Sequence, residues 1–359
     1  MTLAICAITA RGAALARRLG DLLPKAEVWL PEKLRADDQC RYSPAGMTEL
    51  LPQLFSRDHS LICIMATGIV VRSLAPQLQS KASDPAVVVL DEAGHFAISL
   101  LSGHLGGANA LTRQVAALLG ATPVITTATD VNNLCAWDEA ARLANLAVEP
   151  LERIRTLNSL LLQGEKIALV DHERLIAAQF TTTPGVELVA NFSAASQVDA
   201  AGRVFVTERL IPELATQKDL LLLRPRRLVL GIGCNRHTSK KEIAQAVEDV
   251  LKRAWLARKA VGRIATIVEK GDEAGLLAFA AESDLPLLTY SREELNRIPC
   301  PSPPSAPALA AVGAFGVCEP AALLAAGGGP LLIPKQKCGQ VTIAVARLRP
   351  PTPCEDGQA

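Results

Sequence analysis

Short apolar runs rich in valine and isoleucine alternate with amphipathic helical segments along most of the chain. This alternation restricts the fold more than any other feature, because each run has the length of a buried strand and each intervening segment has helical periodicity. Strands that alternate with helices predict α/β units around a mainly parallel sheet. We therefore expect an α/β protein that begins with a mainly parallel-sheet domain.

Turn and stop signals define the expected elements of the first part of the chain. AVVVL and FAISLL flank DEAGH, which predicts a hairpin with Gly94 in its turn. Gly120 follows an apolar helical pattern and predicts the end of that helix. The expected strands lie at 3–8, 60–66, 86–90, 96–101 and from 122 to Asp130, and the expected helices lie near 11–23 and 108–119.

The chain has 359 residues, which is too long for a single core. The pattern of expected helices and strands changes at two places along it. Two helical segments and several short strands follow residue 138, and a proline among charges at 223–227 predicts a boundary. Capping boxes that begin at Ser239 and Ser291 predict helices of a further α/β unit. The proline-rich segment 299–307 predicts a mobile loop. We expect an N-terminal α/β domain (1–137), a small α/β middle region (138–225) and a separate α/β C-terminal domain (226–359).

Composition and charge exclude several classes of protein. The 37 basic and 36 acidic residues give a net charge of +1, so no global field indicates binding to nucleic acid or membrane. The nine scattered cysteines contain no Cys-x-x-Cys pair, which argues against a disulfide framework and a zinc site. No apolar run approaches the ~20 residues of a membrane span, and the N-terminus lacks a secretory pattern. We expect a soluble, cytoplasmic protein with no metal site of its own.

The stretch LSGHLGGANA at 101–110 is a glycine-rich turn that enters an apolar helix. Such a turn exposes backbone N–H groups at the positive end of the helix dipole, where an anion can bind. Its spacing matches neither the dinucleotide fingerprint, nor the phosphate loop, nor the esterase elbow. A tight turn without a ligand remains the alternative. The candidate binding residues here are Ser102, Gly103, Gly106, Gly107 and Asn109.

His104 is the proton-exchanging group of this loop, because histidine titrates near neutral pH. The upstream hairpin turn has Asp91 and Glu92, and we expect its strands to bring these carboxylates to the same end of the sheet as His104. The three residues are therefore candidate catalytic groups. A buried histidine with satisfied hydrogen bonds and two solvated carboxylates is the alternative.

Two further turns have candidate binding residues. Thr67 and Gly68 join a strand to a helix at the edge of the sheet where ligands of open α/β sheets collect, and Arg72, Lys81 and Asp84 follow shortly after. GIGCNRHTS (231–239) joins another strand to a capped helix. Surface ion pairs and a simple tight turn are the alternatives. The candidates from this second turn and from the helix beginning at Cys318 are Gly231, Gly233, Cys234, Arg236, Ser239 and Glu319.

Several segments together resemble the CbiG family, the cobalt-precorrin-5A hydrolases of the anaerobic cobalamin pathway. They run in the family's order from the first strand to about residue 348. They are IMATGIVVR, SKASDPAVVVLDEAGHFAISLLSGHLGGANALT, ATPVITTATD, GIGCNRHTS, VCEPAALLAAGG and GQVTIAVARL. The resemblance implies three parts, of which the last is related to CobE proteins.

The resemblance also implies a reaction. The substrate is a cobalt tetrapyrrole whose ring A acetate is closed as a δ-lactone, and the enzyme opens the lactone and releases acetaldehyde to give cobalt-precorrin-5B. The macrocycle accepts the electrons of the broken C–C bond and carries the cobalt, so no cofactor is expected. His104 becomes the general base, with Asp91 or Glu92 as its orienting partner or as the base itself, and the glycines of its loop become the oxyanion cradle.

The remaining candidates follow from the charge of that substrate. Thr67, Gly68, Arg72 and Lys81, with Arg236 and Ser239 across a domain cleft, would hold its acetate and propionate groups. Neighbouring pathway enzymes that receive the intermediate are further candidate partners. A non-catalytic carrier of corrinoid intermediates and a phosphate or nucleotide binder are the alternatives to the hydrolase. Acetaldehyde release separates the hydrolase from the carrier.

Overall fold

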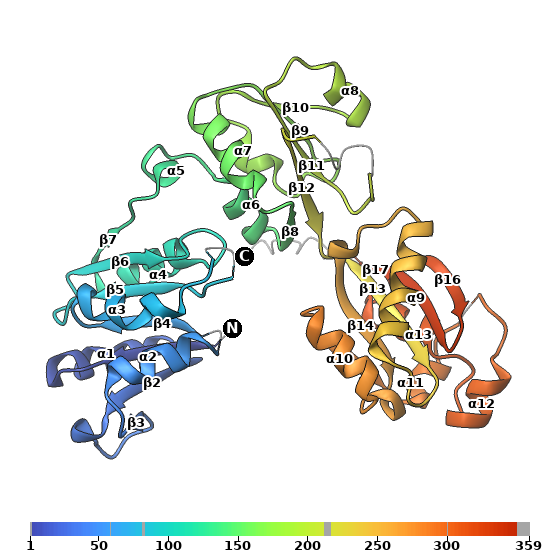
Figure 1. Cartoon of the computed structure of the whole chain (residues 1–359), viewed down its shortest axis with the longest axis horizontal. Helices are drawn as coiled ribbons and strands as arrows, with labels where there is room; N and C mark the ends of the chain where they lie inside the picture. The colour runs from blue at the N-terminus through green and yellow to red at the C-terminus, as the bar shows by residue number, and fades with distance from the viewer. Residues whose placement is uncertain (1, 58, 81–82, 212–216, 300, 350–359) are drawn as a thin grey trace, which may run out of the picture. The chain divides into compact units, whose positions relative to one another are not determined.

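The computed structural model describes residues 2–57, 59–80, 83–211, 217–299 and 301–349 (Figure 1). Contacts between Cα atoms divide the chain into two compact units. The first contains residues 1–144 and 150–204, and the second contains residues 145–149 and 205–359. The strands form three sheets, and each sheet is described below by itself.

The N-terminal sheet is mainly parallel, as predicted. Its order is β3-β2-β1-β4-β5-β6-β7, and every neighbouring pair is parallel except β5 and β6. The strands are β1 (Leu3–Ala7), β2 (Ala26–Pro31), β3 (Arg41–Ser43), β4 (Ser60–Ile64), β5 (Val87–Leu90), β6 (Phe96–Leu101) and β7 (Thr122–Val124).

Helices cover both faces of this sheet, because successive side chains of the buried strands point to opposite sides. On one face, Ile5 of β1 packs in a core with α1 (Ala10–Leu22) and α4 (Ala108–Leu119). On the other face, Cys6 packs in a core with α2 (Met47–Phe55) and α3 (Thr67–Leu74). The alternating apolar runs of the sequence thus become strands buried on both sides.

The antiparallel strand β6 decides where its neighbouring loops lie. Gly94 adopts a left-handed φ of 72° in the hairpin turn, as predicted. The register places Leu90 opposite Ala97 at the turn and Val87 opposite Leu101 at the other end. The segment that begins at Ser102 therefore lies at the amino ends of β4 and β5.

The middle sheet is built from short strands, in the order β10-β9-β11-β12-β8. Before it, α6 (Trp137–Leu143) is anchored by Trp137, whose ring stacks on Phe180 with 4.1 Å between centroids. The other elements are β8 (Leu146–Glu149), α7 (Arg153–Leu162), β9 (Ile167–Val170), β10 (Val186–Leu188), α8 (Phe192–Gln197), β11 (Gly202–Val206) and β12 (Leu220–Pro225).

The C-terminal sheet has the order β15-β14-β13-β17-β16. Strands β13 (Leu228–Cys234), β14 (Val261–Ile267) and β15 (Leu287–Tyr290) are parallel, and the predicted terminal hairpin of β16 (Leu331–Cys338) and β17 (Val341–Arg347) is antiparallel to β13. One face packs on α9 (Lys240–Arg253) and α10 (Ala274–Glu282), and the other on α13 (Cys318–Ala325). The capping boxes at Ser239 and Ser291 are both present, the second at the start of α11 (Arg292–Asn296).

One expectation about local structure is wrong. The strand predicted from residue 122 to Asp130 ends at Val124, and Asp130 lies in the short helix α5 (Ala128–Val131). Residues 299 and 301–305 of the proline-rich segment lie outside helices and strands, as expected of a loop, and its last two residues begin α12 (Ala306–Val312), where Pro307 fits the first turn of a helix. In the part of the chain that the structure describes, no helix has the length and apolar character to cross a membrane.

Candidate active site around His104

Residues 102–107 form a tight turn between β6 and α4. The N–H groups of Gly107, Ala108 and Asn109 donate to the carbonyl oxygens of His104, Ser102 and Gly103. A Cβ atom at Gly106 would lie 2.4 Å from Ser102 Cβ, so only glycine fits there. The glycines therefore shape the turn, and the expected oxyanion cradle lacks the N–H of Gly107 because the turn itself uses it.

This turn places His104 between two carboxylates. Its Nδ1 lies 3.3 Å from Asp138 Oδ2, and its Nε2 lies 3.0 Å from Asp130 Oδ2. The His104 side chain is 12% exposed and that of Asp138 is 5% exposed. Each ring nitrogen therefore faces an acceptor, and the protonated imidazolium can donate to both.

Asp130 is the more exposed of the two partners. Asn109 Nδ2 donates to its Oδ2 at 2.9 Å, and Arg113 forms an ion pair with its Oδ1. Asn109 is itself held by Ser99, whose hydroxyl donates to Asn109 Oδ1 at 2.7 Å. Asp130 thus joins His104 to the first two turns of α4.

Asp138 is fixed from the opposite side. Asn158 of α7 donates from Nδ2 to Asp138 Oδ1 at 2.9 Å, and Asn158 Oδ1 accepts the N–H of Trp137 at 3.0 Å. Because Trp137 is fully buried, the first turn of α6 cannot shift easily. The Asp138 carboxylate is therefore held in place. Its contact with Nδ1 orients the His104 ring so that Nε2 faces Asp130.

His104 and Asp130 line a cavity of about 280 Å³, together with Arg113, Cys135 and Glu139. Burial lowers the pKa of His104, but its contacts with Asp138 and Asp130 raise it by more, so the pKa lies above the usual 6.5. Burial raises the pKa of Asp138, but His104 and Asn158 lower it by more. The site can therefore hold and exchange a proton at a cavity wall.

Comparison with known proteins decides the family. Three family profiles match in chain order: cobalamin synthesis G N-terminal (49–130), cobalamin biosynthesis central region (135–225) and cobalamin synthesis G C-terminus (228–346). The cobalt-precorrin-5A hydrolase of Priestia megaterium is 36% identical over 356 residues, which cover 96% of this chain and 94% of that protein. The chain belongs to the CbiG family. The cobalt-precorrin-5A hydrolase of Salmonella typhimurium is 37% identical over 329 residues, 91% of this chain and 92% of that protein.

The C-terminal part of this CbiG chain is also similar to CobE. Protein CobE of a Sinorhizobium species is 33% identical over 110 residues, which cover 30% of this chain and 70% of that protein. The expected α/β class with a CobE-like last part is therefore confirmed.

In this CbiG chain the expected pairing of His104 with Asp91 or Glu92 is wrong. The hairpin turn that contains both carboxylates lies at the carboxyl end of β5, while His104 follows the far end of β6. Asp91 instead accepts the N–H groups of Ala93, His95 and Phe96, and these bonds outweigh its burial and lower its pKa. Glu92 is exposed and accepts the hydroxyl of Thr9 at 2.8 Å.

The other candidates of the N-terminal sheet divide between its two ends. Thr67 and Gly68 begin α3 at the carboxyl end of β4, and the exposed Arg72 packs its guanidinium on Gly68. Asp84 lies near the His104 turn, where its carbonyl oxygen would meet a Cβ at Gly106. Its side chain accepts the N–H of Gln79. Lys81 lies outside the described residues.

The second glycine motif lies in the C-terminal unit. A Cβ at Gly231 would lie 1.7 Å from Cys318 O, so this glycine lets α13 pack directly on β13. Gly233 lies against Thr342, Ser239 caps α9, and Arg236 is exposed. Cys234 and Glu319 lie on cavity walls.

Sequence reasoning missed Asp130 and Asp138 as partners of His104. Both lie downstream of the motif, in ITTATD and in CAWDE, at the starts of two short helices. One signal was available in the sequence. Asp138 directly follows Trp137, a residue type that is usually buried, and a buried acid needs a partner. The missed residues of the site are Arg113, Asp130, Asp138 and Asn158.

Proposed function

We propose that this chain is a cobalt-precorrin-5A hydrolase that opens the δ-lactone of its substrate at the His104 cavity. The observation that carries the proposal is the histidine held between Asp138 and Asp130 on a cavity wall, in a chain that matches two hydrolases of that name over most of its length. The reaction takes a proton from water and later a proton from an alcohol, and the His104 group meets both needs.

The lactone is opened first. The His104–Asp130 pair accepts a proton from water as the oxygen attacks the lactone carbonyl, and Asp138 orients the imidazole through Nδ1. Arg113 lies on the same wall and stabilises the developing oxyanion or the released carboxylate. The C–O bond breaks, and the pair returns its proton to the leaving oxygen, which becomes an alcohol.

The C–C bond is broken next. The same pair takes the proton of the alcohol, its oxygen becomes the carbonyl of acetaldehyde, and the electron pair of the C–C bond passes into the conjugated macrocycle. The macrocycle is the electron acceptor, so the proposed step needs no separate cofactor. We also propose a cytoplasmic location, handover of the product to neighbouring pathway enzymes, and functional division at residues 137 and 225.

The test follows acetaldehyde release from the lactone substrate in a single turnover. We expect His104→Ala to slow release by about 10²–10⁴-fold, which is the usual contribution of acid–base catalysis, while substrate binding persists. His95→Ala is the matched control, because His95 is 74% exposed at the other end of the same sheet. An unchanged rate in His104→Ala would remove His104 from the reaction.

A further inference from the structure

Two adjoining cavities lie in the C-terminal unit, and none of their lining residues belongs to the His104 site. Their volumes are about 540 Å³ and 150 Å³, and Val317, Cys318 and Lys335 line both. The larger volume falls in the range of small-molecule pockets, roughly 300–1,000 Å³. The lining residues all belong to one compact unit, so the cavities are properties of that unit alone.

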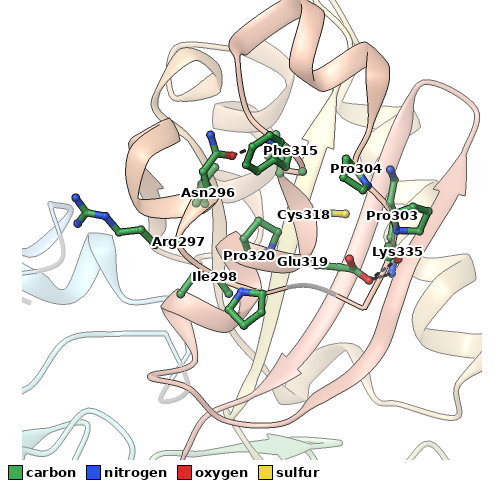
Figure 2. Close-up of a pocket in the computed structure, with 15 residues that line it drawn as sticks. Asn296, Arg297, Ile298, Pro303, Pro304, Phe315, Cys318, Glu319, Pro320 and Lys335 are labelled. Atoms are coloured by element: carbon green, nitrogen blue, oxygen red, sulfur yellow. Dashed lines mark hydrogen bonds between the residues drawn. The ribbon is translucent and has the colours of Figure 1, made fainter.

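The larger cavity has mostly apolar walls, which Figure 2 shows around α13. In such a cavity a few polar groups determine which ligand binds and in which orientation. The apolar wall residues include Ile298, Pro299, Pro303, Pro304, Phe315 and Pro320.

Lys335 reaches this wall because its strand is irregular. Strand β16 is an edge strand, and its register against β17 shifts between Ile333 and Gln336. Pro334 has no N–H to donate there, and Lys335 N–H leaves the ladder and donates to Glu319 Oε1 at 2.9 Å. Such bulges redirect a side chain, and here the redirected side chain is a lysine at the boundary of both cavities.

Two of the other charged groups on these walls already have partners, and a third, Arg297, is exposed. Glu319 Oε1 also accepts the hydroxyl of Ser302 at 2.8 Å, and Lys270 Nζ lies 3.3 Å from Glu273 Oε2. The Arg297 side chain extends away from Glu319 and Cys318 in Figure 2.

Lys335 differs from Glu319 and Lys270 because its ammonium forms no ion pair with any residue that the structure describes, and it differs from the exposed Arg297 because it is half-buried. That ammonium lies near Cys318. Burial raises the pKa of the Cys318 thiol to about 11, and the charge of Lys335 opposes this rise. A half-buried cation without a partner beside apolar walls is stabilised when an anion binds.

We propose that Lys335 binds a carboxylate arm of the tetrapyrrole, while the proline and Phe315 walls contact the adjoining edge of the ring. The identity of the ligand rests on the proposed function. The position of the binding site and the negative charge of the ligand rest on the cavity and on Lys335. A tetrapyrrole with acetate and propionate arms combines the flat apolar edge and the anion that these walls require. Lys335 is then a ligand-binding residue outside the motifs of the sequence.

The test titrates the full chain with uroporphyrin, a stable tetrapyrrole with acetate and propionate arms, and follows its absorbance. We expect Lys335→Gln to weaken binding about 10- to 100-fold, the usual effect of losing one charge-assisted contact. Lys335→Arg should largely retain binding, because the cation remains. Lys337→Gln is the matched control, since Lys337 is an exposed lysine of the same strand and lines neither cavity.

The outcomes separate this proposal from the hydrolase proposal. Equal affinity of the wild type and Lys335→Gln would overturn it, as would an equal loss in Lys335→Arg, which would indicate packing rather than charge. The salt dependence of wild-type binding should decrease in Lys335→Gln. If the wild type binds uroporphyrin through Lys335 but releases no acetaldehyde from the lactone, the hydrolase proposal fails and the cavity proposal stands.

Discussion

At the scale of single residues, the pKa of His104 depends on the groups that surround its ring. A carboxylate at each ring nitrogen stabilises the imidazolium, and this effect exceeds the opposing effect of burial. The raised pKa keeps His104 protonated to a higher pH than a free imidazole. If His104 accepts the proton of water, acetaldehyde release should therefore rise with pH through a value above 6.5.

Asp138→Asn tests this account directly. The change removes one negative charge from Nδ1, so the pKa of His104 should fall, and the rising limb of acetaldehyde release should move to lower pH. The imidazole C–H signals of His104, followed by NMR as a function of pH, measure the shift. Asp91→Asn is the control, because Asp91 holds only its own hairpin turn at the other end of the sheet. A His104 pKa that does not move in Asp138→Asn contradicts the assigned contact.

At the scale of secondary-structure elements, one glycine determines how closely α13 packs on the C-terminal sheet. Gly231→Ala would place a Cβ 1.7 Å from Cys318 O, an overlap that only movement of α13 can relieve. We expect a loss of unfolding free energy of about 3 kcal/mol or more, at the upper end for overpacking. Urea denaturation measures it.

The same variant should also disturb the wall that contains Cys318 and Glu319. Uroporphyrin binding should therefore weaken together with stability. Gly46→Ala provides the comparison, because the nearest atom to its added Cβ is Thr48 Oγ1 at 3.6 Å and Gly46 lines neither cavity. A stable Gly231→Ala protein with normal binding would mean that α13 does not pack as closely as described.

Elements with local signals were predictable from sequence. Gly120 ends α4, and the serines of two capping boxes begin α9 and α11, because these signals act through the backbone of their own segment. The error at Asp91 has a different cause. In a hairpin, the turn lies at one end of the two strands and the second strand finishes at the opposite end. The predicted hairpin therefore already separated Asp91 from His104.

At the scale of the whole molecule, a buried arginine connects distant pieces of the second compact unit. Arg224 is 1% exposed, its Nε lies 2.8 Å from Glu149 Oε2, and it donates to the carbonyl oxygens of Thr207 and Arg209. It thereby holds β8, β12 and the segment after β11 together. A charge in this position is costly when its partner is removed.

Glu149→Gln should therefore destabilise the protein, by about 1–3 kcal/mol because Glu149 is partly exposed. Thermal unfolding at neutral pH measures the change. Glu32→Gln removes an exposed partner of Arg35 and should leave the transition where it is. Equal transitions in all three proteins would show that the Arg224 contact contributes nothing to stability.

The order of the three family segments could be predicted, whereas the partners of His104 could not. Asp130 and Asp138 meet the imidazole through the packing of α5 and α6, and no local pattern encodes that packing. The orientation of Lys335 could not be predicted for a similar reason, because a bulge in an edge strand sets the direction of its side chain.

The contact between His104 and Asp138 also crosses the boundary predicted at residue 137, and the two residues fall in different family profiles. A chimera joined at that boundary would combine His104 from one parent with Asp138 and Asn158 from the other. Recombination between relatives should therefore succeed at junctions beyond Asn158 more often than at the domain boundary itself. His104 and its supporting carboxylate would be inherited as one block, whatever division the sheets suggest.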